Sequence, residues 1–325
     1  MKIEVKERVF HFKQPAGTSR GVYIERKSWF VEVTDGDRRG IGECAPLPDL
    51  SCDARLDYAE VLRRFCNDVE RSGKIDRDAM RDFPSMLFGL ETAMQDVRHE
   101  PASIPINGLV WMGTYEEMYA RVKEKLDAGF HCVKLKIGAI DWQEELELIR
   151  FVRQNFSSDE VELRVDANGG FPVSVALERL KQLSDYDIHS IEQPIRQGQW
   201  DEMGRLCELS PLPIALDEEL IGVNTIEKKI QLLDHIRPQF IVLKPSLHGG
   251  ISGTREWIAL ARERAVGSWI TSALESNVGL YAIAHLALEV YGPDITFPQG
   301  LGTGQLFTDN IPMPIEIKRD RLIIH

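Results

Sequence analysis

Seven short apolar stretches from about residue 104 onward each precede an amphipathic stretch, and this repeat constrains the fold more than any other feature. The apolar stretches have the length of buried strands, whereas the intervening segments carry apolar residues at a helical spacing. The predicted strands lie at 106–110, 132–137, 161–166, 188–192, 213–217, 239–243 and 268–272, with a weak eighth near 295–297. The predicted helices lie at 115–128, 141–155, 173–183, 200–208, 225–233, 252–264 and 278–289.

Strands that alternate with helices in this way form parallel sheets, either closed barrels or doubly wound sheets. Nearly eight repeats, with no Gly-rich dinucleotide-binding loop after the first strand, favour a barrel. Residues 1–44 instead indicate a strand meander, and helices are expected at 53–71 and 84–94. The alternating tail at 314–324 is expected to return to this N-terminal α+β unit.

Charged side chains stand at the ends of the barrel strands. Asp166, Glu192, Asp217 and Lys244 each follow an apolar strand, and consecutive ones lie about 26 residues apart, close to one βα repeat. The repeat therefore brings them to one height on neighbouring strands, at the C-terminal rim where barrel active sites form. Lys134 and Lys136 are two residues apart, so they share one face of the second strand.

Three carboxylates at one rim repel one another and need a countercharge, which hard oxygen ligands most readily obtain from Mg²⁺, with Mn²⁺ as the alternative. A single acid or lysine at a strand end is commonly a helix cap or a solvated charge. Five such residues in register are better explained by a site, in which Lys136 and Lys244 flank the ion from opposite sides, where a general base and a cationic stabiliser would stand. Asn168 and Glu218 would orient a ligand or a lysine.

The motifs resemble the muconate-lactonising branch of the enolase superfamily, and the resemblance covers nearly the whole chain. The matching segments, in chain order, are Lys134-x-Lys136, Asp166-Ala167-Asn168, Glu192-Gln193-Pro194, Asp217-Glu218 and Lys244-Pro245. The resemblance implies an α/β fold in which an α+β capping domain, residues 1–103 joined by the C-terminal segment 311–325, covers a modified (β/α)7β TIM-like barrel at 104–310.

Stretches 272–279 and 296–307 are similar to the o-succinylbenzoate synthase family within that branch. This resemblance implies a Mg²⁺-dependent hydro-lyase of menaquinone biosynthesis, which dehydrates 2-succinyl-6-hydroxy-2,4-cyclohexadiene-1-carboxylate to o-succinylbenzoate. The implied metal ligands are Asp166, Glu192 and Asp217, and the implied catalytic residues are Lys136 as base, Lys244 and Lys134. The implied substrate-binding residues are Ser272, Glu275 and Ser276 on the seventh strand, with Ser19 and Arg20 in a capping loop.

An N-acylamino acid racemase or dipeptide epimerase on the same scaffold is the alternative, because lysines on both faces also suit a two-base racemase. No Asp-x-Asp follows the seventh or eighth strand to hold an ammonium group, which favours the synthase. A metal-dependent hydrolase would carry His-rich ligands, and no His-x-His occurs. A Schiff-base aldolase would not need three acids in register.

The resemblance implies a small-molecule carboxylate substrate as the partner, and the composition disfavours other classes. A net charge of −12 disfavours nucleic acid, and no apolar run has the length of a membrane helix. The five cysteines form no Cys-x-x-Cys motif and indicate free thiols in a reducing cytoplasm, and no signal peptide is evident. The oligomeric state stays open.

Overall fold

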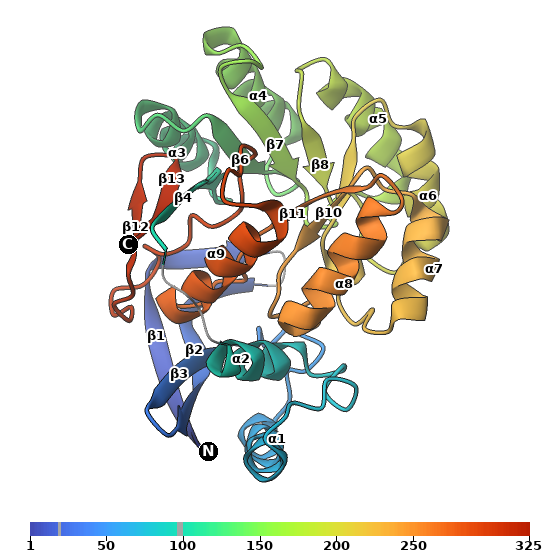
Figure 1. The fold of residues 1–325 in the computed structure, drawn as a ribbon. Coiled ribbons are helices and arrows are strands. Elements are labelled where there is room, and N and C mark those ends of the chain that lie inside the picture. Colours follow the sequence, from blue (N-terminus) through green and yellow to red (C-terminus); the bar gives the residue numbers. More distant parts are fainter. Residues whose placement is uncertain (19–20, 96–99) are drawn as a thin grey trace.

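The computed structural model describes residues 1–18, 21–95 and 100–325, which form an N-terminal antiparallel sheet beside a curled parallel sheet (Figure 1). In the N-terminal sheet, β1 (Lys2–Thr18), β2 (Gly21–Asp35) and β3 (Arg38–Cys44) lie side by side in chain order. The turn between β2 and β3 contains Gly36 at a φ of +61°, which glycine adopts without steric cost. This is the strand meander that the sequence predicts.

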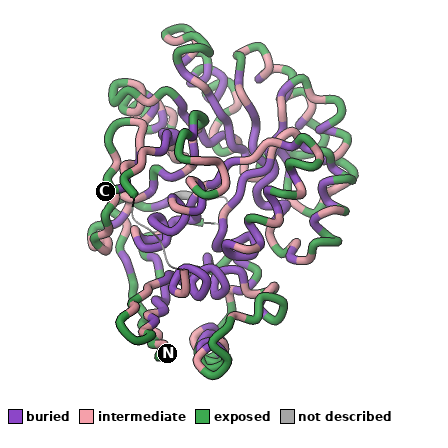
Figure 2. Tube along the Cα trace, in the orientation of Figure 1, coloured by how far each residue is buried: buried purple, intermediate pink, exposed green. Residues whose placement is uncertain are grey.

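Two helices, α1 (Tyr58–Ser72) and α2 (Pro84–Met94), complete the N-terminal unit. α1 begins later than the predicted residue 53, because the segment before it forms turns and the Asp53 carboxylate accepts hydrogen bonds from Ser85 N and Oγ at 2.8 and 2.6 Å. α2 is buried almost throughout, since it packs against β3 on one side and against the barrel helix α8 (Gly250–Arg262) on the other (Figures 1 and 2).

The parallel sheet has seven strands in the order β11-β10-β9-β8-β7-β6-β5. They are β5 (Gly108–Val110), β6 (Cys132–Lys136), β7 (Glu162–Asp166), β8 (Ser190–Glu192), β9 (Ile214–Leu216), β10 (Phe240–Leu243) and β11 (Gly267–Ile270). The other helices are α3 (Tyr115–Asp127), α4 (Trp142–Asn155), α5 (Val173–Ser184), α6 (Trp200–Leu209), η1 (Glu218–Leu220), α7 (Ile226–Ile236), α8 and α9 (Asn277–Tyr291). No helix in residues 1–18, 21–95 or 100–325 is long and apolar enough to cross a membrane.

Strand register decides which side chains face the inside of the curled sheet. Lys136 pairs with Asp166, and Asp166 pairs with Glu192, so these three side chains point the same way. The alternate residues, such as Leu135 and Val165, face outward and pack in the main hydrophobic core under the helices. The same alternation places apolar residues on the outer face of the sheet, against the helices. It places charged residues on the inner face.

A short segment closes the barrel where the sequence indicates a weak eighth strand. Gln299 forms a parallel bridge with Ile106 near β5, and Gly300 forms one with Thr271 just after β11. The Gln299 side chain adds a bond, because its oxygen accepts from Ile270 N at 2.8 Å. The closure lies at 299–300 instead of the predicted 295–297, and the architecture is the predicted (β/α)7β barrel.

The C-terminal strands β12 (Ile315–Lys318) and β13 (Arg321–Ile324) pair with β4 (Ala102–Pro105) in a separate three-stranded sheet. The chain just before them touches the N-terminal sheet, since Phe307 bridges to Phe12. Ile311 and Met313 pack against the cluster that contains Phe10 and Phe30, whereas Ile315 packs against the main core, so the C-terminal segment contacts both units. The proposed division at residues 103, 104 and 311 remains a prediction.

Candidate active site

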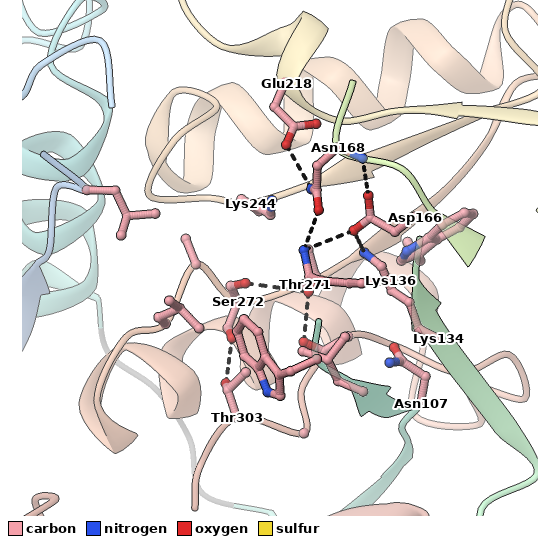
Figure 3. A pocket seen from close by; sticks show the side chains of 18 of the residues that line it. Asn107, Lys134, Lys136, Asp166, Asn168, Glu218, Lys244, Thr271, Ser272 and Thr303 are labelled. Atoms are coloured by element: carbon pink, nitrogen blue, oxygen red, sulfur yellow. Dashed lines mark hydrogen bonds and ion pairs between the residues drawn. The ribbon is translucent and has the colours of Figure 1, made fainter. Parts of the chain in front are cut away.

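A pocket opens where the barrel strands end, and most of the charged residues singled out from the sequence line it (Figure 3). Its polar side contains Lys134, Lys136, Asp166, Asn168, Glu218 and Lys244. Its apolar side includes Leu47 and Leu50 from the N-terminal unit, and Trp111, Ala273 and Leu274 from the barrel. Glu192 and Asp217 lie deeper, 2% and 0% exposed. The pocket is therefore charged on the barrel side and apolar near the N-terminal unit.

Lys134 joins two of the three predicted metal ligands. Its Nζ atom lies 2.9 Å from Asp166 Oδ2, and 2.7 and 2.6 Å from the two carboxylate oxygens of Glu192. Carboxylates from two neighbouring strands therefore converge on one cation. Burial alone would lower the pKa of Lys134, but Asp166 and Glu192 outweigh it and raise that pKa above its usual range.

Lys136 is held by a chain of polar contacts. Its Nζ atom donates to Asn168 Oδ1 at 2.7 Å and lies 3.4 Å from Asp166 Oδ2. The Asn168 amide in turn donates to Glu218 Oε1 at 3.0 Å. The indole ring of Trp111 faces the ammonium group, with 5.8 Å between Nζ and the ring centroid. Asn168 thus fixes the position of the lysine and links it to Glu218.

Lys244 stands on β10's C-terminal side, four strands away from β6, so it faces the other lysines across the pocket. Its ammonium group bonds Asp217 Oδ2. The Lys244 backbone N–H donates to His248 Nδ1 at 2.9 Å, which leaves Nε2 as the protonated nitrogen of the neutral ring. Nε2 lies 3.9 Å from Asp217 Oδ1. His248 lies outside the residues singled out from the sequence, although its place one helical turn after Lys244 is a local signal.

Four carboxyl groups face three ammonium groups in this cluster, and the carboxyl pKa values reflect the imbalance. Burial would raise the pKa of Asp166, but Lys134 and Lys136 hold it well below its usual range. Burial and the Asp166 charge raise the pKa of Glu192 to about 8. Burial and Asp217 raise the pKa of Glu218 to about 7. If all four carboxyl groups ionise, their charge exceeds that of the three lysines, so a further cation would favour the ionised forms of Glu192 and Glu218.

The donor set fits a hard divalent ion, although the carboxylates do not all surround one point. In the described ranges, no three His, Cys, Asp or Glu side chains are already grouped as a metal site. The physical reason is that Lys134 and Lys244 lie against the carboxylates. Asp217 Oδ1 is buried and, within the described residues, has no hydrogen-bond partner, so it remains available as an oxygen ligand.

Among the predicted substrate-binding residues that the structure describes, only Ser272 lines the pocket. Ser272 lines the pocket and bonds the Thr303 hydroxyl. Glu275 and Ser276 are not among the lining residues, because Glu275 accepts from Ala273 N at 2.6 Å and Ser276 bonds Glu43 at the start of α9. Ser19 and Arg20 lie outside the described residues.

Several lining residues were not singled out from the sequence. They include Leu47, Leu50, Asn107, Leu109, Trp269, Thr271, Ala273, Leu274 and Thr303. Thr303 belongs to the Gly-rich stretch that carries part of the family resemblance, so that stretch was a usable signal. The two leucines come from a Pro-rich segment that only tertiary packing brings to the barrel.

The fold and the site agree with comparisons to known families. Residues 117–314 match the family model described as Enolase C-terminal domain-like, and residues 18–97 match the model described as MenC, N-terminal domain. The first match covers more than half of the chain. The chain therefore belongs to the enolase superfamily, whose members generally depend on a divalent metal.

Full-length relatives narrow the class further. The o-succinylbenzoate synthase of Desulfotalea psychrophila is 44% identical, with 98% of this chain and 97% of the relative covered. The crystal structure of MenC from the same organism matches with a TM-score of 0.82 and 39% identity over 99% of both chains. Within the superfamily, the chain belongs to the o-succinylbenzoate synthase family.

The fold is shared more widely than this family. The L-Ala-D/L-Glu epimerase of Bacillus subtilis gives a TM-score of 0.82 at 21% identity, with 100% of this chain and 96% of that chain covered. Similarity at that level of identity shows the common fold alone.

Proposed function

We propose that the chain dehydrates 2-succinyl-6-hydroxy-2,4-cyclohexadiene-1-carboxylate to o-succinylbenzoate, a step of menaquinone biosynthesis. The observation that carries the proposal is the 44% identity with an o-succinylbenzoate synthase over nearly the full length. The site supplies matching chemistry, because lysines stand on both sides of a pocket whose floor is anionic. A reaction that removes a proton next to a carboxylate needs such a base and such charge stabilisation.

Lys136 is the proposed base, and it must be neutral to act. It takes the proton from the ring carbon that bears the carboxylate, and the electron pair left behind expels the β-hydroxyl group. The same ammonium group then returns the proton, so that water leaves and the ring becomes aromatic. Lys244, across the pocket, stabilises the negative charge that develops on the substrate. Lys134 holds Asp166 and Glu192 beside the base.

Asp166, Glu192 and Asp217 are the proposed ligands of Mg²⁺, with Mn²⁺ as the alternative. The ion supplies positive charge for the substrate carboxylate when bound. Lys134 and Lys244 contact these carboxylates in the structure, and the ion would add to the positive charge that they supply. Asn168 and Glu218 hold Lys136 in the pocket.

The test is a steady-state assay of the purified chain with Mg²⁺ on the cyclohexadiene carboxylate. Lys136→Ala is expected to lower kcat by about a thousandfold, since a general base contributes on this scale. Lys123→Ala, an exposed lysine on α3, is the matched control and should leave kcat unchanged. A wild type that forms no aromatic product would contradict the proposal.

Epimerase relatives define the competing outcome of the same test. A D-Ala-D/L-Ala epimerase of Cytophaga hutchinsonii is 23% identical over 88% of this chain. Deuterium exchange at the α-carbon of N-acylamino acids or dipeptides, without dehydration, would move the function to racemisation by the same lysines.

A small-molecule carboxylate is the proposed ligand, with neither nucleic acid nor membrane as partner. The cytoplasm is the proposed location, because Cys44, Cys52, Cys66, Cys132 and Cys207 are all free thiols.

A further inference from the structure

Arg26 on β2 is a buried arginine between the N-terminal unit and the barrel. It is 2% exposed, and its described side-chain hydrogen bonds all go to main-chain carbonyls. Nη1 donates to Pro46 O at 2.7 Å, and Nη2 bonds Ala45 O. Nη2 and Nε donate to Ala273 O and Leu274 O, each at 3.3 Å. One guanidinium group therefore joins two separate loops.

Both loops form the apolar wall of the pocket. Pro46 directly precedes Leu47, which lines the pocket from the N-terminal unit, whereas Ala273 and Leu274 line it from the barrel. Leu47, Ala273 and Leu274 also pack in one small hydrophobic cluster. Arg26 does not line the pocket, but it fixes the distance between the two halves of this wall.

The barrel loop needs such support because its backbone is strained. Leu274 has a φ of +65°, a left-handed conformation that is sterically unfavourable for a non-glycine residue. Glu275 holds the same loop from its other side, since one carboxylate oxygen accepts from Ala273 N at 2.6 Å and the other bonds Ser246. The carbonyls and the N–H of this loop are thus both satisfied by buried charged groups.

We propose that Arg26 is a positioning residue for substrate recognition, an inference that rests on the proposed function. It holds the 45–47 and 273–274 segments at the spacing that fits the part of the substrate away from the lysines. Its described partners include none of the charged groups that line the pocket. Loosening it should therefore weaken binding of ground state and transition state alike, which raises KM and leaves kcat in place.

The experiment compares Arg26→Lys with wild type. A lysine keeps the charge but its single ammonium group cannot span both pairs of carbonyls. We expect KM, and the Kd of o-succinylbenzoate measured by calorimetry, to rise about tenfold, while kcat stays within about twofold. The matched control is Arg153→Lys on α4. Arg153 donates to the carbonyls of Tyr186, Val161 and Asp187 at 2.7, 2.8 and 3.0 Å and does not line the pocket, so its KM should not change.

A second variant keeps the inference testable if Arg26→Lys folds poorly. Glu275→Gln keeps the shape of the side chain but weakens its hold on Ala273 N, so it should also raise KM and Kd with kcat nearly constant. Thermal melting is recorded for every variant. A lower melting temperature of Arg26→Lys with unchanged KM and Kd would overturn the inference, and so would a fall in kcat at constant KM. If Arg26→Lys does not fold, Glu275→Gln decides by the same criteria.

Failure of the proposed function gives a different pattern. A wild type that binds o-succinylbenzoate but forms no product overturns the function, and the ratio of Kd values between wild type and Arg26→Lys still decides the inference. A wild type that neither binds nor converts these compounds overturns both.

Discussion

The proposed base, Lys136, makes its shortest described hydrogen bond with an amide side chain. Asn168 accepts from Lys136 Nζ and donates to Glu218, and its φ is +44°. Asn168→Gly removes the side chain and tolerates that backbone conformation. We expect kcat to fall about 10- to 100-fold, as for other residues that orient a catalytic group. Steady-state kinetics and thermal melting measure this. A variant with wild-type kcat would show that Lys136 needs no such support.

Asp53 makes the stability of the N-terminal unit depend on pH. Burial raises its pKa from 3.8 to about 6, against the hydrogen bonds from Ser85. The folded state therefore binds the proton more tightly than the unfolded state. The contribution of Asp53 to the free energy of unfolding is most favourable below pH 4, and it falls as the pH rises towards 6. At pH 7 the ionised carboxylate costs about 3 kcal/mol.

Asp53→Asn removes this dependence because the amide does not titrate and can still accept from Ser85. Urea unfolding in EDTA between pH 4 and pH 7 gives the measurement. The wild type should lose stability relative to Asp53→Asn over this range. Parallel stability curves for the two proteins would contradict the prediction.

The site could be predicted from the sequence where neighbouring strands repeat the same pattern. Asp166, Glu192 and Lys244 stand at corresponding strand ends, so spacing alone indicated that they meet. Arg26 and His248 could not be found this way. The partners of Arg26 are carbonyls of distant loops, and a carbonyl carries no sequence signal.

At the scale of elements, a strand of the N-terminal unit caps a barrel helix. Glu43 on β3 accepts four hydrogen bonds: from Ser28 Oγ at 2.8 Å, from Ser276 N and Oγ at 3.0 and 2.6 Å, and from Gly279 N at 3.0 Å. Ser276 is the N-cap residue of α9, and Gly279 lies in the first turn of that helix. Glu43→Gln removes the charge that faces the helix dipole. It also places an amide NH2 group, a hydrogen-bond donor, opposite the hydroxyl and N–H donors that Glu43 accepts from. We expect a loss of about 2 kcal/mol in the free energy of unfolding, measured in urea.

Glu116→Gln is the matched control for that prediction. Glu116 also lies in the first turn of a helix, α3, but it is exposed. Its replacement should change stability by about 0.5 kcal/mol or less. Equal effects of the two substitutions would mean that burial and the four bonds add nothing to the simple dipole interaction.

Elements were predictable where periodicity extends over a full strand or helix. The helix expected to begin at Pro84 is α2, which starts at that residue because Pro84 suits a first turn. The barrel closure at Gln299 and Gly300 is too short to show alternation, so the apolar residues at 295–297 misplaced it. The predicted strand 106–110 is shortened to β5 (Gly108–Val110), because Ile106 and Asn107 link it to β4 (Ala102–Pro105), which belongs to a different sheet.

At the scale of the molecule, the N-terminal unit and the barrel share one site. β3 approaches α2 so closely that a Cβ atom on Gly42 would lie 1.8 Å from Gly89 O. This contact sets α2 against α8, where Glu91 accepts from Ser252 N at 3.1 Å. Leu47 is thereby brought to a pocket whose charged residues all belong to the barrel. Neither unit contains the whole pocket. A change in how the N-terminal unit packs against the barrel is therefore expected to alter activity.

The same arrangement predicts that a divalent ion stabilises the folded chain. Four carboxyl groups face three lysines, and a bound ion would relieve their repulsion only when the barrel is closed. Mg²⁺ at a hundred times its Kd should add about 2.7 kcal/mol relative to EDTA, seen as a higher melting temperature. Asp217→Asn should lose this increment. Glu219→Gln should keep it, because Glu219 is bonded to Gln193 and Gly198 and does not line the pocket. An increment that survives in Asp217→Asn would place the ion elsewhere.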